Sequence, residues 1–325
     1  MTSPPEWNRQ FAYFRAVGDG DAEDVSRFLG LEPNESWSAG ESFELYDTIF
    51  RRTSSVWRLD SGVGDDADLR EHIDALLEKL ARRADGLKAL REIFRPEIVC
   101  VGSSYQHFYV DLAKDRLQKA TSLGLRFVID AYGFGDLHEQ MMALRELANS
   151  GQSGAGDSID DQDTPKPSAD EYEDEYEYAQ LLIEASPKEV ESLLGVPPDR
   201  GWAKGDDWVH QGGDRGPRRF SRSFIDSGLG RREPMDRHIV ALLERLEPNR
   251  TGVMTMSAQV ETTLDCVSRT TGSFNWSLDF PLQQSIAALG VNLGVDAHPG
   301  DIHEEITRLR EKVGLRRSGR RRRYW

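Results

Sequence analysis

Alternating and helical patterns of apolar residues follow one another along the chain and predict a mixture of strands and helices. Residues 69–80 carry Leu and Ile at spacings of three and four, the pattern of an amphipathic helix with one face on a core. A second helix is expected over 112–123. Short apolar runs at 11–17, 97–101 and 125–130 are typical of buried strands. We expect an α+β fold, in which a mixed or antiparallel sheet is covered on one face by helices.

The same pattern occurs twice in the chain. The segment LGLEPNESWSAG, which begins at Leu29, recurs as LGVPPDRGWAKG from Leu194, 165 residues later. The predicted helix DLREHIDALLEKL from Asp68 recurs as PMDRHIVALLERL from Pro234, 166 residues later. Because the two matches have nearly the same spacing, they indicate an internal duplication. The fold is therefore expected to consist of two tandem repeats of one unit.

Charge separates the repeats from the segments around them. The net charge is -15, with 56 Asp and Glu against 41 Lys and Arg. Residues 157–177 are strongly acidic and poor in large apolar side chains, as in a flexible linker. Residues 316–323 carry six arginines. The expected organisation is an N-terminal tail (1–10), a first repeat domain (11–148), an acidic flexible linker (149–175), a second repeat domain (176–314) and a basic C-terminal tail (315–325).

Composition narrows the functional classes. A mean hydropathy of -0.59, no apolar run near the roughly 20 residues that cross a bilayer, and no secretory leader pattern favour a cytoplasmic protein without a membrane span. The chain has no GxxxxGK phosphate loop, GxGxxG turn, GxSxG elbow or CxxC pair. We therefore predict no cofactor, no metal site and no catalytic residue, and favour a protein that is not an enzyme.

Two pairs of equivalent residues are the best candidates for binding. Trp37 and Trp202 lie in loops rich in Pro and Gly, where a tryptophan either fills the edge of the core or acts as a binding anchor. Asp130 and Asp296 end the last strand of each unit, where a carboxylate either caps the next turn or points into a cleft. Both copies keep these residues, and that is the evidence for them.

Histidine and cysteine form two further pairs. His72 and His238 lie near the start of the long helix, where a histidine either packs at the boundary of the core or acts as a general base. We keep both as candidate binding residues. Cys100 and Cys266 lie at equivalent positions on predicted buried strands, so we expect them to be small apolar side chains of the core rather than reactive thiols.

The repeated motifs also carry a resemblance. The doubled LG(L/V)xPxxxWxxG element, the HIxALLExL helix and a closing strand that ends in Asp resemble the bacterial family called domain of unknown function 4279. The last strand in that family usually ends in Asp, a hydrophobic residue and Tyr, as at 130–132, whereas the second unit ends in Asp, Ala and His at 296–298. The resemblance implies no established reaction. By analogy with small bacterial proteins that accompany toxin and defence genes, the resemblance suggests an immunity or accessory role.

These observations leave three functional hypotheses. The leading one is non-catalytic protein binding, in the manner of an immunity or antitoxin-like protein or a defence accessory factor, with a toxin as one candidate partner. The alternative is an enzyme or small-ligand binder with a cleft between the two repeats, which would use Asp130, Asp296 and His72 or His238. The third is nucleic-acid binding, for which only the Arg-rich tail supplies the positive charge that phosphates require.

Overall fold

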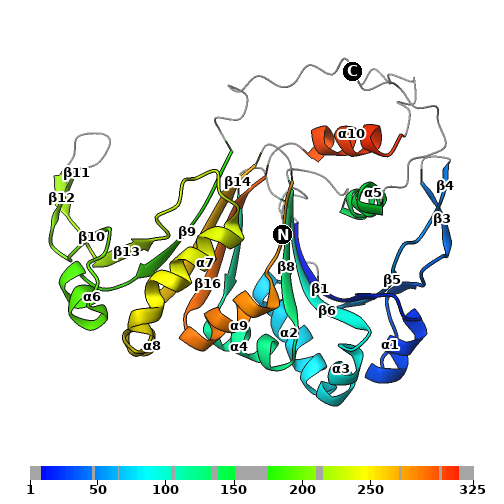
Figure 1. The fold of residues 1–325 in the computed structure, drawn as a ribbon, viewed down its shortest axis with the longest axis horizontal. Helices are drawn as coiled ribbons and strands as arrows, with labels where there is room; N and C mark the ends of the chain where they lie inside the picture. The colour runs from blue at the N-terminus through cyan, green and yellow to red at the C-terminus, as the bar shows by residue number, and fades with distance from the viewer. Residues whose placement is uncertain are drawn as a thin grey trace.

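Two mixed six-stranded sheets with helices packed against them form the protein, as expected for an α+β chain of two repeats (Figure 1). The computed structural model describes residues 9–45, 48–64, 66–103, 107–132, 138–150, 175–209, 215–270, 273–299 and 302–314. Most of the predicted acidic linker and the whole basic tail lie outside the described residues. None of the described helices is long and apolar enough to span a membrane.

The first copy of the repeat covers residues 9–150. In chain order its elements are β1 (Arg9–Gly18), α1 (Ala22–Leu29), β2 (Glu35–Trp37), β3 (Ser42–Leu45), β4 (Thr48–Arg51), β5 (Ser55–Asp60), α2 (Leu69–Ala81), α3 (Ala84–Leu90), β6 (Phe94–Ser103), β7 (Phe108–Leu112), α4 (Lys114–Ser122), β8 (Arg126–Tyr132) and α5 (His138–Ser150).

The second copy covers residues 175–314 and repeats this order. Its elements are β9 (Tyr176–Ile183), α6 (Pro187–Leu194), β10 (Arg200–Trp202), β11 (Asp207–Val209), β12 (Arg215–Pro217), β13 (Arg222–Asp226), α7 (Met235–Leu246), the short 3-10 helix η2 (Glu247–Asn249), α8 (Arg250–Gln259), β14 (Thr262–Arg269), β15 (Phe274–Ser277), α9 (Phe280–Leu289), β16 (Asn292–His298) and α10 (Ile302–Lys312).

Local sequence explains where the helices begin and end. Asp68 accepts hydrogen bonds from the backbone N–H groups of Arg70 and Glu71, and Glu71 bonds back to the N–H of Asp68, so a capping box starts α2. Gly30 ends α1 in the left-handed conformation, at φ +61°, and Gly195 does the same for α6. The glycine caps therefore repeat along with the sequence motif that contains them, whereas α7 begins after Pro234 without a side-chain cap.

The two copies exchange strands. The sheet orders are β15-β8-β6-β1-β5-β2 and β10-β13-β9-β14-β16-β7. Strand β7 leaves the first copy and pairs with β16, with Val110 opposite Val295. Strand β15 of the second copy pairs in the same register with β8, with Trp276 opposite Ile129. Each sheet therefore contains five strands of one copy and one strand of the other.

Strand β7 is also where the structure differs from the sequence prediction. The predicted helix at 112–123 is a helix only from Lys114, because residues 108–112 are extended along the edge of the second sheet. Phe108, Val110 and Leu112 point to the core, and the residues between them point away from it. This is the period of two expected of a strand with one buried face.

One face of each sheet lies on a continuous hydrophobic core. Helices α1 to α4 and α6 to α9 cover this face, which we call the helical face (Figure 1). Cys100 and Cys266 belong to this core, both as free buried thiols, as predicted. Burial raises the pKa of each thiol well above its ordinary value, so both stay protonated and unreactive.

The opposite face of the first sheet, which we call the open face, carries a smaller core. Tyr13 and Val99 from the sheet pack there with Leu144 of α5 and with Ile306 of α10. Helix α10 of the second copy thus lies beside α5 of the first (Figure 1). A cavity opens on the open face between α5 and the β3–β4 hairpin.

Candidate functional site

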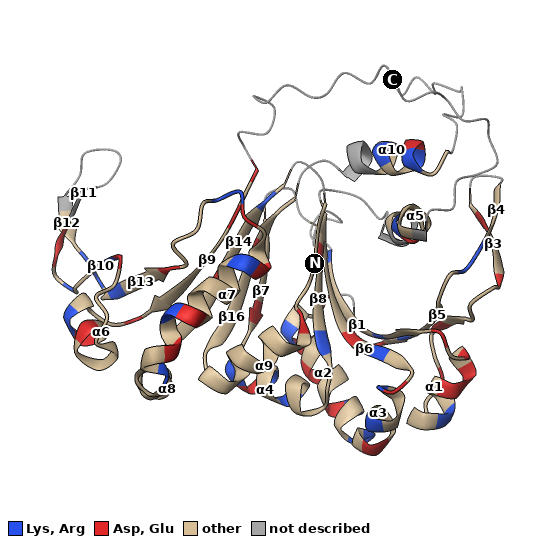
Figure 2. Cartoon of the chain, in the orientation of Figure 1, with Lys and Arg blue, Asp and Glu red and all other residues tan. Residues whose placement is uncertain are grey.

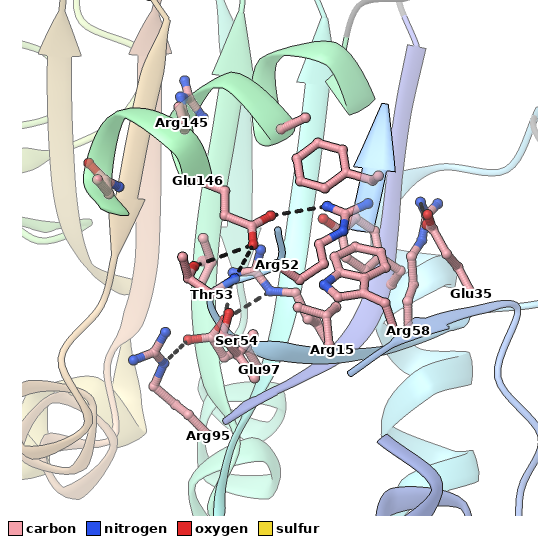
Figure 3. A pocket seen from close by; sticks show the side chains of 18 of the residues that line it. Arg15, Glu35, Arg52, Thr53, Ser54, Arg58, Arg95, Glu97, Arg145 and Glu146 are labelled. Atoms are coloured by element: carbon pink, nitrogen blue, oxygen red, sulfur yellow. Dashed lines mark hydrogen bonds and ion pairs between the residues drawn. The ribbon is translucent and has the colours of Figure 1, made fainter. Parts of the chain in front are cut away.

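A cavity of about 890 Å³ opens on the open face of the first sheet. Strands β1, β5 and β6 form its floor, and the β3–β4 hairpin and α5 form its walls (Figure 3). Its size falls within the range of ligand sites in proteins, about 300 to 1,000 Å³. The lining is unusually rich in charge. The charged residues are Arg15, Arg52, Arg58, Arg95, Arg145, Glu35, Glu44, Glu97 and Glu146.

Glu97 holds two arginines on the floor of the cavity. Arg15 Nε and Nη2 both donate to Oε2 of Glu97, at 3.1 and 2.6 Å, and Arg95 Nε donates to Oε1 at 2.6 Å. The carboxylate is only 2 % exposed. Burial alone would raise its pKa, but the charges of Arg15 and Arg95 more than offset burial and hold the pKa of Glu97 below its usual value. We call these three residues the Arg15–Glu97–Arg95 cluster.

Arg52 joins the hairpin to the helix above the sheet. Its guanidinium lies 3.9 Å from the ring centroids of both Trp37 and Phe43, so it stacks on two aromatic rings. Its Nη1 donates to Oε2 of Glu146 on α5, at 3.1 Å. Glu146 Oε1 in turn accepts from the backbone N–H of Thr53 at 3.3 Å. These contacts tie the hairpin wall of the cavity to α5.

Arg58 and Tyr13 form another part of the lining. The Arg58 guanidinium lies 4.3 Å from the centroid of the Tyr13 ring and makes ion pairs with Asp60, at 3.0 Å, and Glu35, at 3.5 Å. Burial raises the pKa of Tyr13 to about 12, so the phenol is protonated near neutral pH. Tyr13 thus contributes a buried, uncharged phenol to the lining.

The second copy supplies one side of the cavity. Asn275 and Ser277 on β15 belong to its lining, and Arg126 Nη2 of the first copy donates to Ser277 Oγ at 2.9 Å. Arg145 on α5 also bridges the copies, because it bonds to Asp130 of the first and to Ser273 Oγ of the second. Strand exchange is thus what completes the site.

The predicted tryptophans have matching positions in the two copies. Trp37 lies beneath Arg52 at the cavity, and Trp202 lies beneath Arg218, 4.2 Å from the guanidinium to the ring centroid. Trp202 also packs on Phe224, with ring centroids 5.6 Å apart. Each indole therefore anchors the base of a hairpin, and only Trp37 also lines the large cavity.

The predicted aspartates lie on different sheets. Asp130 is fully buried, and Arg145 Nη1 donates to its Oδ1 at 2.8 Å. Asp296 is 30 % exposed and lies 3.3 Å from Nε2 of His298. Burial, and to a lesser degree the charge of Asp296, raises the pKa of the neighbouring Asp265. The two aspartates do not meet in one cleft.

The predicted histidines lie on the helical face, away from the cavity. His72 Nδ1 is 2.7 Å from Ser61 Oγ, and His238 Nδ1 is 2.6 Å from Ser227 Oγ. Both imidazoles are buried in helices that pack on the core. Each pair ties the loop after a strand to the first turn of the following helix. Because it recurs at the same place in both copies, we interpret it as part of the scaffold.

Sequence reasoning missed the charged floor of the cavity, because it searched for residues that both copies keep. The strand registers place Leu182 and Thr263 of the second copy where the first has Arg15 and Glu97. The usable signal is therefore a difference between the copies: Glu97 is a buried charged residue in β6, and its counterpart in the second copy, Thr263, is neutral.

Comparison with known proteins identifies the repeat but not its function. A family model described as Domain of unknown function (DUF4279) matches residues 6–134 and again residues 174–300, once in each copy. No curated protein and no solved structure matches the chain.

Proposed function

The chain belongs to the family Domain of unknown function (DUF4279), and we propose that it is a non-catalytic binding protein whose cavity in the first copy receives a segment of a partner protein. The observation that carries the proposal is a cavity of about 890 Å³ whose arginine and aromatic side chains are held in fixed positions by ion pairs. Preformed sites of this kind lose little conformational entropy when a ligand binds.

The lining favours a protein partner. Trp, Tyr and Arg dominate the binding energy of protein interfaces, because they bury large areas and also make directional polar contacts. Trp37, Tyr13 and Arg52 provide all three residue types in one cavity. The cavity is bordered by a sheet face, a hairpin and a helix, so an extended or turn segment of a partner can enter it. An immunity-type role, with a toxin as partner, is the form of this proposal that the resemblance suggests.

Binding without catalysis fits the positions of the reactive side chains. The thiols of Cys100 and Cys266 are buried in the core with raised pKa values. The buried His72 and His238 lie on the helical face, whereas the cavity is on the open face. Among the described residues, the cavity lining has neither cysteine nor histidine.

A small polar molecule is the second candidate ligand. Asn275 and Ser277 of β15 place the second copy at the wall of the cavity, so the site lies where the two copies meet. That position agrees with a small-ligand site between repeats. The third hypothesis, nucleic-acid binding, depends on the basic tail, which lies outside the described residues. Several of the described helices carry Asp or Glu alongside their Lys and Arg (Figure 2).

The proposal is tested by filling the cavity. Ala143 on α5 lines it, so Ala143→Trp places an indole inside, whereas Met254→Trp adds the same side chain to an exposed position on α8. The full chain and both variants are immobilised, and proteins bound from the native host are quantified. We expect one partner to be lost at least about tenfold with Ala143→Trp and retained with Met254→Trp.

The same experiment tests the absence of catalysis. The intact mass of the partner is measured before and after incubation with stoichiometric protein. An unchanged mass supports the proposal. Equal capture by both variants, with circular dichroism showing that both are folded, would show that the cavity is not the binding site. A new covalent mass or a cleavage product would instead establish an enzyme.

A further inference from the structure

We infer that the Arg15–Glu97–Arg95 cluster is an oxyanion-binding subsite of the cavity, suited to a carboxylate or a phosphate group of the ligand. The inference rests on the proposed function only in placing the ligand in this cavity. Both arginines line it, and the Glu97 carboxylate lies between them (Figure 3). What the cluster can bind depends on which of its hydrogen-bonding groups are already in use.

Hydrogen-bond donors exceed acceptors in the cluster. Each guanidinium has five N–H groups, whereas a carboxylate offers about four acceptor positions. Glu97 accepts two bonds from Arg15 and one from Arg95, so most of its acceptor capacity is taken. Nη1 of Arg15 and both Nη groups of Arg95 make no hydrogen bond to any other described residue. The groups left over are thus N–H donors.

The cluster also carries a net positive charge, which favours an anion at its spare N–H donors. Two guanidiniums share one carboxylate, which leaves about one positive charge. The Arg15 side chain is 14 % exposed, so solvent screens it less than a surface charge. Planar guanidinium groups bind carboxylate and phosphate through paired N–H···O bonds, which are stronger than bonds between neutral groups. An oxyanion is therefore the group that the cluster can accept.

The second copy indicates that the fold does not require the cluster. Its strands place Leu182 and Thr263 at the positions of Arg15 and Glu97. Glu261, one residue before β14, corresponds to Arg95 at the repeat spacing of 166 residues. A buried ion pair contributes little net stability compared with apolar residues in the same place. Charge that only one copy keeps is therefore better explained by a ligand than by folding.

The same comparison supplies the test variant. Arg95→Glu gives the first copy the residue of the second and reverses one charge of the cluster. Arg232→Glu makes the same change at an exposed position outside the cavity, so the net charge of the two variants is equal. The full chain and both variants are titrated at low salt with inorganic phosphate and, separately, with N-acetylaspartate. Calorimetry and the fluorescence of tryptophan, which includes Trp37, report binding.

We expect saturable binding of at least one probe, weakened about tenfold or more by Arg95→Glu and changed less than about twofold by Arg232→Glu. The preferred probe identifies the group: phosphate indicates a phosphorylated ligand, and N-acetylaspartate indicates a ligand carboxylate. The double variant Arg15→Leu/Glu97→Thr copies the second sheet and should abolish binding while the protein stays folded.

Two results would overturn the inference. One is an equal loss of probe binding in Arg95→Glu and Arg232→Glu, which would mean that binding depends on the net charge of the protein. The other is the absence of saturable binding of either probe to the full chain. Both results are distinguishable from a failure of the proposed function. If Ala143→Trp abolishes partner capture and Arg95→Glu does not affect it, the cavity is still the binding site. Only the oxyanion subsite is then excluded.

Discussion

Arg15 donates through Nε and Nη2 to a single oxygen of Glu97, across the register of β1 and β6, where the two residues lie directly opposite each other. The second copy has Leu182 opposite Thr263 at this place. One fold thus holds a buried ion pair in one copy and an uncharged pair in the other. Because the backbone is the same, the effect of the charges on stability can be measured against an alternative that the chain itself provides.

Removing one member of the pair is expected to be costly. Glu97→Thr leaves the Arg15 guanidinium without its carboxylate, and loss of one partner of a buried pair costs about 3 to 5 kcal/mol. Arg15 is 14 % exposed, so we expect the lower part of that range. Arg15→Leu/Glu97→Thr should recover most of the loss. Urea unfolding of the two variants and the unaltered chain gives both free energies. A double variant as unstable as the single one would contradict this account.

The duplication and the main elements could be predicted from sequence, because they depend on local patterns. The apolar period of α2 and the glycine that ends α1 occur within short segments, and both recur in the second copy. The family assignment follows from the same motifs. Strand exchange could not be predicted in this way. The sequence of β7 alternates as a strand should, but nothing in residues 108–112 determines which of two similar sheets it joins.

The cavity could not be predicted from the sequence for a related reason. Arg15 and Glu97 are 82 residues apart, and their contact exists only once β1 and β6 are paired in register. The tryptophans were found because both copies keep them, and the structure gives both the same position beneath an arginine. Residues that serve the scaffold repeat, whereas the charged floor of the cavity does not. Retention in both copies therefore selected mainly structural residues.

Close helix packing should reverse the usual effect of replacing glycine by alanine. A Cβ at Gly86 in α3 would lie 2.1 Å from the carbonyl oxygen of Phe28, and one at Gly252 in α8 would lie 2.6 Å from that of Leu193. Alanine normally stabilises a helix by about 1 kcal/mol relative to glycine. Here the clash is with backbone, so we expect each Gly→Ala variant to lose about 1 to 3 kcal/mol.

Gly230→Ala is the matched control for these glycines, because a Cβ at Gly230 meets nothing within 4 Å. Its stability should stay within about 0.5 kcal/mol of the unaltered chain. Thermal and urea unfolding of the three variants provide the comparison. If Gly86→Ala and Gly252→Ala were as stable as Gly230→Ala, the helices would not approach as closely as described.

Strand exchange predicts that the copies stay together after the chain is cut. A protease site inserted between residues 150 and 175 separates the copies covalently, but β7 and β15 remain paired with the sheet of the other copy. We expect the cleaved protein to elute at the mass of the intact chain, as measured by light scattering. The combination Val110→Pro/Trp276→Pro removes an N–H group from each exchanged strand and should promote dissociation of the cleaved form.

Two separate particles of about half the mass, formed by the cleaved chain without the proline substitutions, would show that the exchanged strands do not hold the copies together. Uncleaved protein with both prolines is the control for misfolding. It should remain one particle, because the chain still joins the copies, and its circular dichroism should keep the strand and helix content of the unaltered protein.

The buried His238 should make stability depend on pH. Burial lowers the pKa of its imidazole more than the nearby Glu177 and Glu233 raise it, so the folded protein resists protonation at this site. The unfolded chain takes up the proton near pH 6.5. Below that pH the unfolded state binds more protons than the folded state, and stability falls as the pH falls towards the lowered pKa. Above about pH 6.5 the site contributes no pH dependence.

His238→Gln removes this titration, and the amide retains a group that can bond to Ser227 Oγ, 2.6 Å from Nδ1 in the unaltered chain. Between pH 7 and pH 5 we expect the free energy of unfolding to fall less in the variant than in the unaltered protein. One titrating group can change this free energy by at most about 1.4 kcal/mol per pH unit, and we expect the difference between the two slopes to be a fraction of that limit. Urea unfolding across this range measures the slopes, and equal slopes for His238→Gln and the unaltered chain would mean that His238 titrates alike in the folded and unfolded states.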